Sequence, residues 1–289
     1  MRAITTLANE LLLLLSTVAQ LIAVTLGIAV IYGLMRVINF AHGEFITMGG
    51  YSVLILTRLH VNFWIALLLA PFMVGAIGLV LERLIIRHLY GRLIDSLLAT
   101  FGLSLGLAQL MVIIFGTSPA GVANPLGNVA IGSSRIGLYQ IALIPLVAFL
   151  VLLTWYVFTR TMYGIRARAA LTAADAAVTV GINRARLNMV TFAIGAGLAG
   201  AAGALLSPLT AIQLYMGQNY LALSFLTLIA GGGAAVTGST VAGSLLGSIQ
   251  NLTTVLSSPV VGEAAVLVVA IVILRFFPNG LSAKWRSEL

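Results

Sequence analysis

The sequence predicts an all-α membrane protein, a polytopic bundle of transmembrane helices, from three observations. Hydrophobic residues make up 61% of the 289 positions and charged residues only 8%, against about 25% charged in an ordinary soluble domain, so the usual polar surface cannot be built. Long apolar runs such as 11–31 are present, without the ten-residue alternation typical of an outer-membrane barrel. Since a spanning helix needs about 20 mainly apolar residues, there is room for about eight or nine spans in one transmembrane domain, residues 1–289.

Nine apolar segments are the candidate spans, and three of them are short. Phe45–Leu56, Tyr220–Gly232 and Val241–Leu256 fall below the length of a full crossing, so we expect short, broken or re-entrant helices, or extension by neighbouring residues. The number of full crossings therefore stays open between eight and nine. In chain order the candidates are Leu11–Met35, Phe45–Leu56, Phe63–Leu81, Ser96–Phe115, Leu138–Phe158, Leu187–Leu206, Tyr220–Gly232, Val241–Leu256 and Ala264–Phe276.

Arginine and lysine gather in three connecting regions, and short loops rich in these residues stay cytoplasmic. The basic regions are the loop with Arg83, Arg87 and Arg92, the loop 160–186, and the C-terminal stretch with Arg275, Lys284 and Arg286. The loops 116–137 and 207–219 carry one charge and none, so we expect them to face outward. This topology, with a cytoplasmic C-terminus, explains the net charge of +8 better than a nucleic-acid partner. The N-terminus lies outside with nine crossings, or inside if one short segment is re-entrant.

Glycine residues mark two features of the later spans. The run from Gly195 to Gly203 places small residues three or four positions apart, a spacing that lets helices approach closely. Three consecutive glycines at 231–233 predict a broken or hinged helix, because glycine costs about 1 kcal/mol relative to alanine inside a helix. A discontinuous helix of this kind can line a pathway.

The stretch Val37–Phe45 is the most unusual in the chain, because Asn39, His42 and Glu44 lie between two apolar segments within six residues. Ionisable residues at membrane depth mark functional sites by default, since hydrocarbon offers no hydrogen bonds. The alternative is a cytoplasmic turn whose polar groups cap the neighbouring helices. On a helix Asn39 and His42 share a face and Glu44 points elsewhere, so all three converge only if Gly43 interrupts the helix.

Enzymatic chemistry is not expected of this chain. An acid–base pair of His42 and Glu44 would lack an accompanying Ser or Cys nucleophile motif, and no His and carboxylate cluster provides a metal site. The absence of cysteine excludes disulfides and thiolate ligands. No Gly-x-x-x-x-Gly-Lys-Ser/Thr loop is present, so the chain cannot hydrolyse ATP by that machinery and any ATP must be a partner's; we expect no cofactor in this chain.

The loop 160–186 contains an alanine-rich stretch, 171–181, that predicts a short helix with Gly181 at its C-terminal cap. Leu171, Ala174, Val178 and Gly181 would form one apolar stripe outside the membrane. Docking of this helix in a partner's groove is the functional interpretation. A helix lying on the lipid surface is the alternative.

Four stretches in order carry a resemblance to a known family. They are GLMRVINFAHGEF at Gly33–Phe45, YGIRARA through GIN at Tyr163–Asn183, TFAIG with LAGAAG at Thr191–Gly203, and LRFFPNGL at Leu274–Leu281. Together they resemble permease subunits of the branched-chain amino acid and urea/amide ABC importer family. The resemblance implies a multi-pass protein of the bacterial inner membrane, in contact with lipid. It also implies a second homologous permease, two cytoplasmic ATPases that bind ATP and Mg²⁺, and a periplasmic or lipid-anchored solute-binding protein.

The resemblance further implies that the loop 160–186 transmits closure of the ATPase pair to the spans. The residues expected to couple the chain to the ATPases are Arg166, Leu171, Ala174, Asp175, Val178 and Gly181.

Two stretches, Leu89–Gly102 and Gly217–Phe225, look more like urea-type than amino acid permeases, although Leu93 and Asp175 depart from the expected pattern. We therefore expect an importer of urea or a short amide. Such a solute needs amides and hydroxyls along its path. The alternatives are the same machinery for branched-chain amino acids, or a stand-alone secondary transporter or channel in which His42 and Glu44 relay protons or shape a filter. The expected pathway residues are Asn39, His42, Glu44, Thr100 and Gln218.

Overall fold

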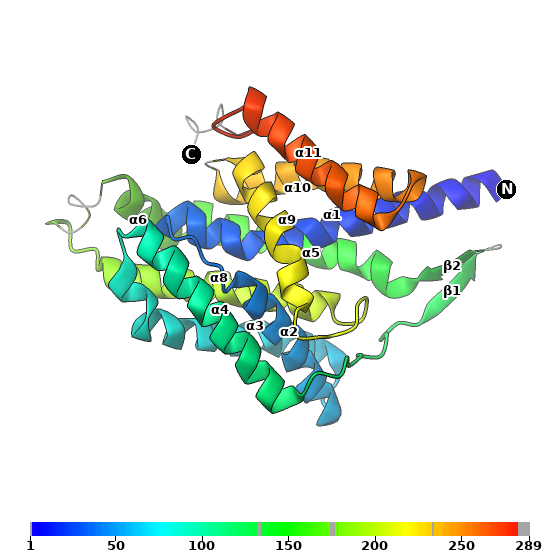
Figure 1. The fold of residues 1–289 in the computed structure, drawn as a ribbon, viewed down its shortest axis with the longest axis horizontal. Coiled ribbons are helices and arrows are strands. Elements are labelled where there is room, and N and C mark those ends of the chain that lie inside the picture. Colours follow the sequence, from blue (N-terminus) through cyan, green and yellow to red (C-terminus); the bar gives the residue numbers. More distant parts are fainter. Residues whose placement is uncertain (1, 132–133, 174–176, 178, 233, 283–289) are drawn as a thin grey trace.

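The computed structural model describes residues 2–131, 134–173, 177, 179–232 and 234–282 (Figure 1). Within this part of the chain, ten α-helices are accompanied by one 3₁₀ helix and one β-hairpin. In chain order the elements are α1 (Arg2–Met35), α2 (His42–Arg58), α3 (Phe63–Leu84), η1 (Ile86–Leu89), α4 (Leu93–Phe115), β1 (Asn128–Ile131), β2 (Ser134–Gly137), α5 (Leu138–Arg160), α6 (Met162–Thr172), α8 (Arg184–Leu206), α9 (Met216–Gly231), α10 (Ala235–Leu256) and α11 (Pro259–Phe276).

The helices confirm the polytopic all-α class but give fewer straight spans than the sequence suggested. By length and composition, α1, α3, α4, α5, α8 and α11 can each cross a membrane. The bent pair α9 and α10 adds at most one more, so the described residues provide six or seven spans rather than eight or nine. The short segments account for the difference. α2 has 17 residues, or about 25 Å of helix, against a hydrocarbon core of about 30 Å.

α8 is the central helix of the bundle and packs against α1, α2 and α3. Its glycines are the points of closest approach: Gly195 faces α1, Gly200 faces α3, and Gly203 faces the carbonyl oxygen of Ile46 in α2. An added Cβ at any of the three would collide with these neighbours. The close packing predicted from the small-residue spacing is therefore confirmed, and α8 forms the frame on which the polar site is built.

The predicted break at the glycine run separates α9 from α10. α9 ends at Gly231, Gly232 has a φ of +84°, and the two helices are bent by 116°; Gly233 lies outside the described residues. The segment 280–282 closes this elbow. The Leu281 amide donates to the Ala230 carbonyl at 2.8 Å, and the Ser282 hydroxyl donates to the Gly231 carbonyl at 2.5 Å. The carbonyls left free at the end of α9 are satisfied by these donors.

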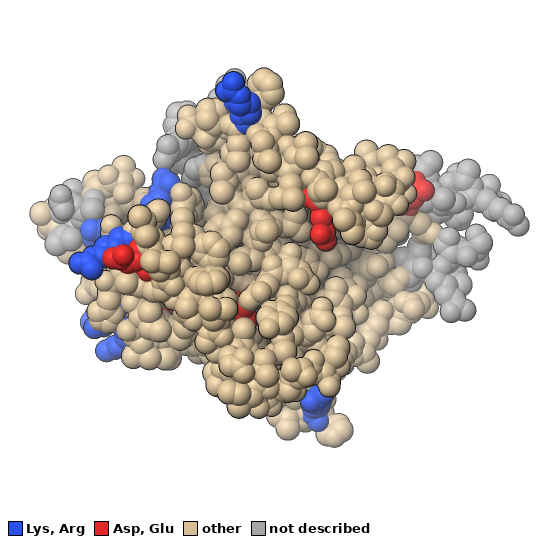
Figure 2. Space-filling view, in the orientation of Figure 1, with Lys and Arg blue, Asp and Glu red and all other residues tan. Residues whose placement is uncertain are grey.

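The two ends of the bundle differ in charge. The N-terminal end of α1 and the β1–β2 hairpin lie at one end of the molecule, and α6 lies at the other (Figure 1). Most of the Lys and Arg side chains in view gather at the α6 end (Figure 2). The hairpin itself was not predicted. β1 and β2 pair antiparallel, with Asn128 opposite Gly137, so part of the loop 116–137 is ordered by backbone hydrogen bonds.

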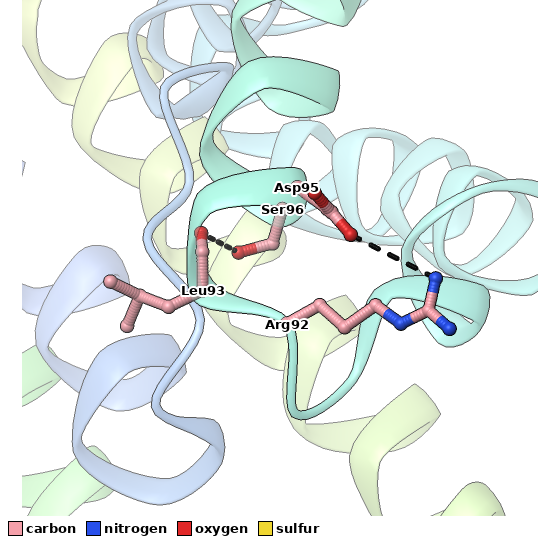
Figure 3. A network of polar contacts seen from close by, with 4 residues as sticks. All are labelled: Arg92, Leu93, Asp95 and Ser96. Atoms are coloured by element: carbon pink, nitrogen blue, oxygen red, sulfur yellow. Dashed lines mark hydrogen bonds and ion pairs between the residues drawn. The ribbon is translucent and has the colours of Figure 1, made fainter.

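The connection between α3 and α4 is held by polar contacts at the basic end of the molecule. The Tyr90 hydroxyl donates a hydrogen bond to the buried carboxylate of Glu82. In the first turn of α4, the Ser96 hydroxyl donates to a backbone carbonyl at 2.8 Å, and Arg92 lies 3.8 Å from Asp95 (Figure 3). Because both charged side chains are more than half exposed, their ion pair adds little, and the buried contact fixes the corner.

Candidate functional site

The chain between α1 and α2 is non-helical and yet buried. Residues 36–41 leave the helix after Met35, and Asn39 has no exposed surface. Thr100 of α4 braces this segment: its hydroxyl oxygen accepts a hydrogen bond from the Phe40 amide at 3.1 Å and lies 3.2 Å from the Ile38 carbonyl. Non-helical backbone at membrane depth persists only where protein groups satisfy it. The segment between α1 and α2 is therefore buried and braced by α4.

The Asn39 side chain forms a hydrogen bond within its own segment. Its side-chain oxygen accepts a hydrogen bond from the Ala41 amide at 3.0 Å, the geometry of an Asx turn. Its side-chain nitrogen is buried and has no hydrogen-bond partner among the described residues. Asn39 therefore stabilises the turn into α2 and keeps two amide hydrogens available to a molecule that reaches it.

His42 begins α2 and reaches back to α1. Its Nε2 donates to the Val24 carbonyl at 2.8 Å, and the Ser224 hydroxyl of α9 lies 3.3 Å from the same oxygen. Because a carbonyl only accepts, the proton is on Nε2. Nδ1 is buried and has no partner among the described residues. The ring thus links α1 to α2 and leaves one acceptor unused.

Glu44 is the centre of a contact between three helices. Its Oε1 accepts from the Ser104 hydroxyl of α4 at 3.1 Å and from the Gln218 side-chain amide of α9 at 2.9 Å. The side chain is fully buried, and Oε2 has no hydrogen-bond partner in the described part of the chain. The carboxylate therefore holds three elements together with half of its acceptor capacity unused.

Close backbone approach brings Gln218 to Glu44. Gly43 of α2 and Gly217 of α9 touch where the two helices begin, and a Cβ added at Gly217 would collide with the Gly43 carbonyl oxygen. The Gly217 amide also donates to the Thr47 hydroxyl at 2.9 Å. Gly43 lies inside α2 and does not interrupt it, so the convergence anticipated at Gly43 does not arise from a helix break there.

The five predicted pathway residues thus occupy one region but form separate hydrogen-bond groups. Glu44 and Gln218 bond directly, Thr100 braces the segment that contains Asn39, and His42 turns to α1. Ser104, Thr47 and Ser224 were missed. Ser104 could have been predicted from the sequence, since it follows Thr100 by four positions and therefore lies on the same face of α4. No group of three metal-ligating side chains occurs among the described residues.

The predicted coupling loop is partly described. Arg166 is exposed on α6, and Leu171 is exposed in the last turn of the same helix. Leu171 does not begin a new helix, because α6 starts at Met162 and runs through it. The other predicted coupling residues, Ala174, Asp175 and Val178, lie outside the described residues.

Gly181 has the backbone conformation expected of the predicted C-terminal cap. Its φ is +80°, and the Ile182 amide donates to the Ala177 carbonyl at 3.0 Å, the pattern of a glycine C-cap. Beside it is a pocket of about 450 Å³ that includes two cationic side chains, Arg166 and Arg186. This basic end of the molecule therefore offers a concave surface for an acidic partner group.

Comparison with known proteins gives one family. The profile described as branched-chain amino acid transport system / permease component matches residues 11–276. The high-affinity branched-chain amino acid transport system permease protein LivH of Escherichia coli is 29% identical over 286 residues, covering 92% of each chain. The corresponding protein BraD of Pseudomonas aeruginosa is 29% identical over 288 residues, again with 92% of each chain covered.

An archaeal protein is also similar. The probable branched-chain amino acid transport permease protein LivH of Methanocaldococcus jannaschii is 27% identical over 287 residues, covering 92% of this chain and 90% of the relative. No solved structure matches the chain.

Proposed function

The chain belongs to the branched-chain amino acid transport permease family, and on that premise we propose that it carries branched-chain amino acids inward as the translocation subunit of an ABC importer. The observation that carries the proposal is the similarity to named permease proteins over 92% of both chains. The relatives are permease components and not enzymes, with the ATPase a separate subunit. The site agrees with transport, because it holds the buried polar groups Asn39, His42 and Glu44.

The proposed solute differs from the urea or short amide that the stretches 89–102 and 217–225 suggested. The relatives' names favour the alternative, branched-chain amino acids. Such a solute is a zwitterion with an apolar side chain, so its path needs both charged or strongly polar groups and apolar surface. Glu44 supplies a carboxylate oxygen without a described partner, and Asn39 supplies free amide hydrogens.

We assign the residues around the break between α1 and α2 to the transport path. Asn39, His42 and Glu44 each keep one buried polar atom without a described partner. Unsatisfied buried groups of this kind cost about 1–3 kcal/mol each, and a passing polar solute or water relieves that cost. Thr100 and Gln218 act beside them, Thr100 by bracing the unwound segment and Gln218 by holding Glu44.

Energy enters at the basic end. In the proposed mechanism the loop 160–186, including Arg166, Leu171 and Gly181, contacts the ATPases, which bind ATP and Mg²⁺. The partners are a second homologous permease, two cytoplasmic ATPases and an external solute-binding protein in the bacterial inner membrane, and the C-terminus is cytoplasmic. The exposed position of Arg166 and the glycine cap at Gly181 support this role.

Reconstitution tests the proposal. The chain is incorporated into liposomes with its partner permease and ATPases, and uptake of labelled leucine and labelled urea is measured with and without ATP and the binding protein. We expect leucine uptake that requires both. Urea uptake without leucine uptake would restore the amide assignment. Solute movement by the purified chain alone would contradict the importer and indicate a secondary transporter or channel.

A paired substitution tests the coupling loop. Replacing Asp175 and Gly181 together should abolish ATP-dependent uptake while the protein stays in the membrane at normal abundance. Replacing Gly102, which has open space around it, by alanine is the matched control. Unchanged uptake by the double variant would exclude the loop as the coupling element.

A further inference from the structure

A second polar pocket lies beside the middle of α1 and is lined by no residue of α6. It has a volume of about 420 Å³ and forms where the chain between α8 and α9, the first turns of α9, the last turns of α10 and the start of α11 meet α1. It was not among the predicted site residues. It is not part of the Glu44 site, because the residues that line it do not include Asn39, His42, Glu44, Thr100 or Gln218.

The pocket contains one carboxylate and no basic side chain. Glu263, one turn into α11, lines it, and none of the lining residues is Lys or Arg. Glu263 makes no hydrogen bond or ion pair with the described residues. Glu263 is exposed, and a carboxylate without a cationic partner among the described residues favours a positively charged ligand.

Amides and hydroxyls line the rest of the polar wall. The side chains of Gln213, Asn219 and Gln250 make no hydrogen bond to the described residues, and Asn251 uses one of its two amide hydrogens on Thr17 at 3.3 Å. Each side-chain amide therefore has at least one free N–H, and N–H donors suit a carboxylate. A ligand that carries both an ammonium and a carboxylate group finds a partner for each within one pocket.

Apolar side chains complete the pocket. Leu21 of α1 and Met216 and Leu223 of α9 line it beside the polar groups. An aliphatic side chain of the ligand would remove apolar surface from water there. Urea has neither an ammonium group to neutralise Glu263 nor an aliphatic chain to cover this apolar wall.

α9 separates the pocket from the buried site. Met216, Tyr220 and Leu223 face the pocket, whereas Gln218 lies on another face of the helix and bonds Glu44. A residue two positions along a helix is turned by about 200°. Movement of α9 alone would therefore change both places at once.

We propose that this pocket is a binding site for the solute inside the permease, and that Glu263 binds the α-ammonium group of an aliphatic amino acid there. The side-chain amides of Asn219 and Gln250 receive its carboxylate, and Leu21, Met216 and Leu223 receive its side chain. The inference rests on the proposed importer function. It adds to that function a specific binding site and the class of solute that the site binds.

A thiol-protection experiment tests binding directly. The chain has no cysteine, so Gln213→Cys places its single thiol in the pocket. In the complete importer, the rate of labelling by a membrane-impermeant maleimide is measured with leucine, with leucinol, which lacks the carboxylate, and with 4-methylpentanoate, which lacks the ammonium. We expect leucine to protect best, leucinol to protect, and 4-methylpentanoate to leave the rate unchanged.

Variants of Glu263 identify the group that binds the ammonium. In the Gln213→Cys background, Glu263→Gln should raise the leucine concentration for half protection by about tenfold or more, since a lost charge pair of about 1.4 kcal/mol is a tenfold change. Glu263→Asp should retain protection. Glu10→Gln, which removes an exposed acidic group near the N-terminal end of α1, is the control and should protect like the parent.

The outcomes separate this inference from the proposed function. Equal protection by 4-methylpentanoate, or full protection in Glu263→Gln, overturns the ammonium site even when the parent importer takes up leucine. No protection by any compound overturns the pocket as a binding site. ATP-dependent uptake of leucine by the parent importer is measured in parallel, and its absence overturns the proposed solute whatever the labelling shows.

Discussion

Substitution of Gly217 by alanine should open the contact that holds Gln218 against Glu44. The added Cβ meets the backbone carbonyl of Gly43, which cannot rotate away as a side chain would. Overpacking of this kind costs about 1–3 kcal/mol, and separating the helices also strains the hydrogen bond from Gly217 to Thr47, worth about 1 kcal/mol. Because alanine favours the helix more than glycine does, the substitution also stabilises the protein by at most about 1 kcal/mol. We expect a net loss of about 1–3 kcal/mol.

Unfolding by SDS in mixed micelles, followed by far-ultraviolet circular dichroism, measures this loss. Gly106→Ala is the matched control, since Gly106 lies within α4 and an added Cβ meets nothing within 4 Å. This control should be neutral or stabilised by up to about 1 kcal/mol. Leucine uptake by the importer should fall in Gly217→Ala and not in the control. A Gly217→Ala chain as stable as Gly106→Ala would refute the argument from backbone contact.

Three further substitutions follow from the described contacts. Thr100→Val should lower the free energy of unfolding by about 1–3 kcal/mol, because the Phe40 amide and the Ile38 carbonyl lose their partner; Thr154→Val, whose hydroxyl bonds only within its own helix, should cost less in the same SDS titration. Arg168→Lys should cost about 1 kcal/mol in thermal unfolding, since a lysine cannot reproduce the two guanidinium bonds to the end of α5; an unchanged midpoint would exclude that cap. Gly232→Ala should cost at least about 1–2 kcal/mol, because its φ is +84°, and equal stability to Gly106→Ala would contradict it.

Features that depend on neighbouring positions were predictable from the sequence. The small-residue spacing in α8 and the glycine break after Gly231 are local patterns, and both appear in the structure. The C-cap at Gly181 is equally local. The polar stretch containing Asn39 and Glu44 was recognised as unusual because polar residues are rare between apolar spans.

The partners of that polar stretch could not be predicted in the same way. Glu44 bonds Ser104 and Gln218, which are 60 and 174 positions away, and His42 bonds a backbone carbonyl, which leaves no trace in residue identity. The helix start at Leu171 was wrong, because α6 already contains that residue. The periodicity of the sequence indicates which residues share one face of a helix. It does not indicate which residues of other helices that face contacts.

The contacts of residues 280–282 with the end of α9 bear on how the chain is made. These residues emerge from the ribosome only after α10 and α11 have been synthesised, yet they supply the donors for the Ala230 and Gly231 carbonyls. Until these residues have been synthesised, the two carbonyl groups at the end of α9 are therefore unpaired or bonded to water. The elbow reaches its final form only when the later chain folds back over it, so α9 is completed by residues that are synthesised after α10 and α11.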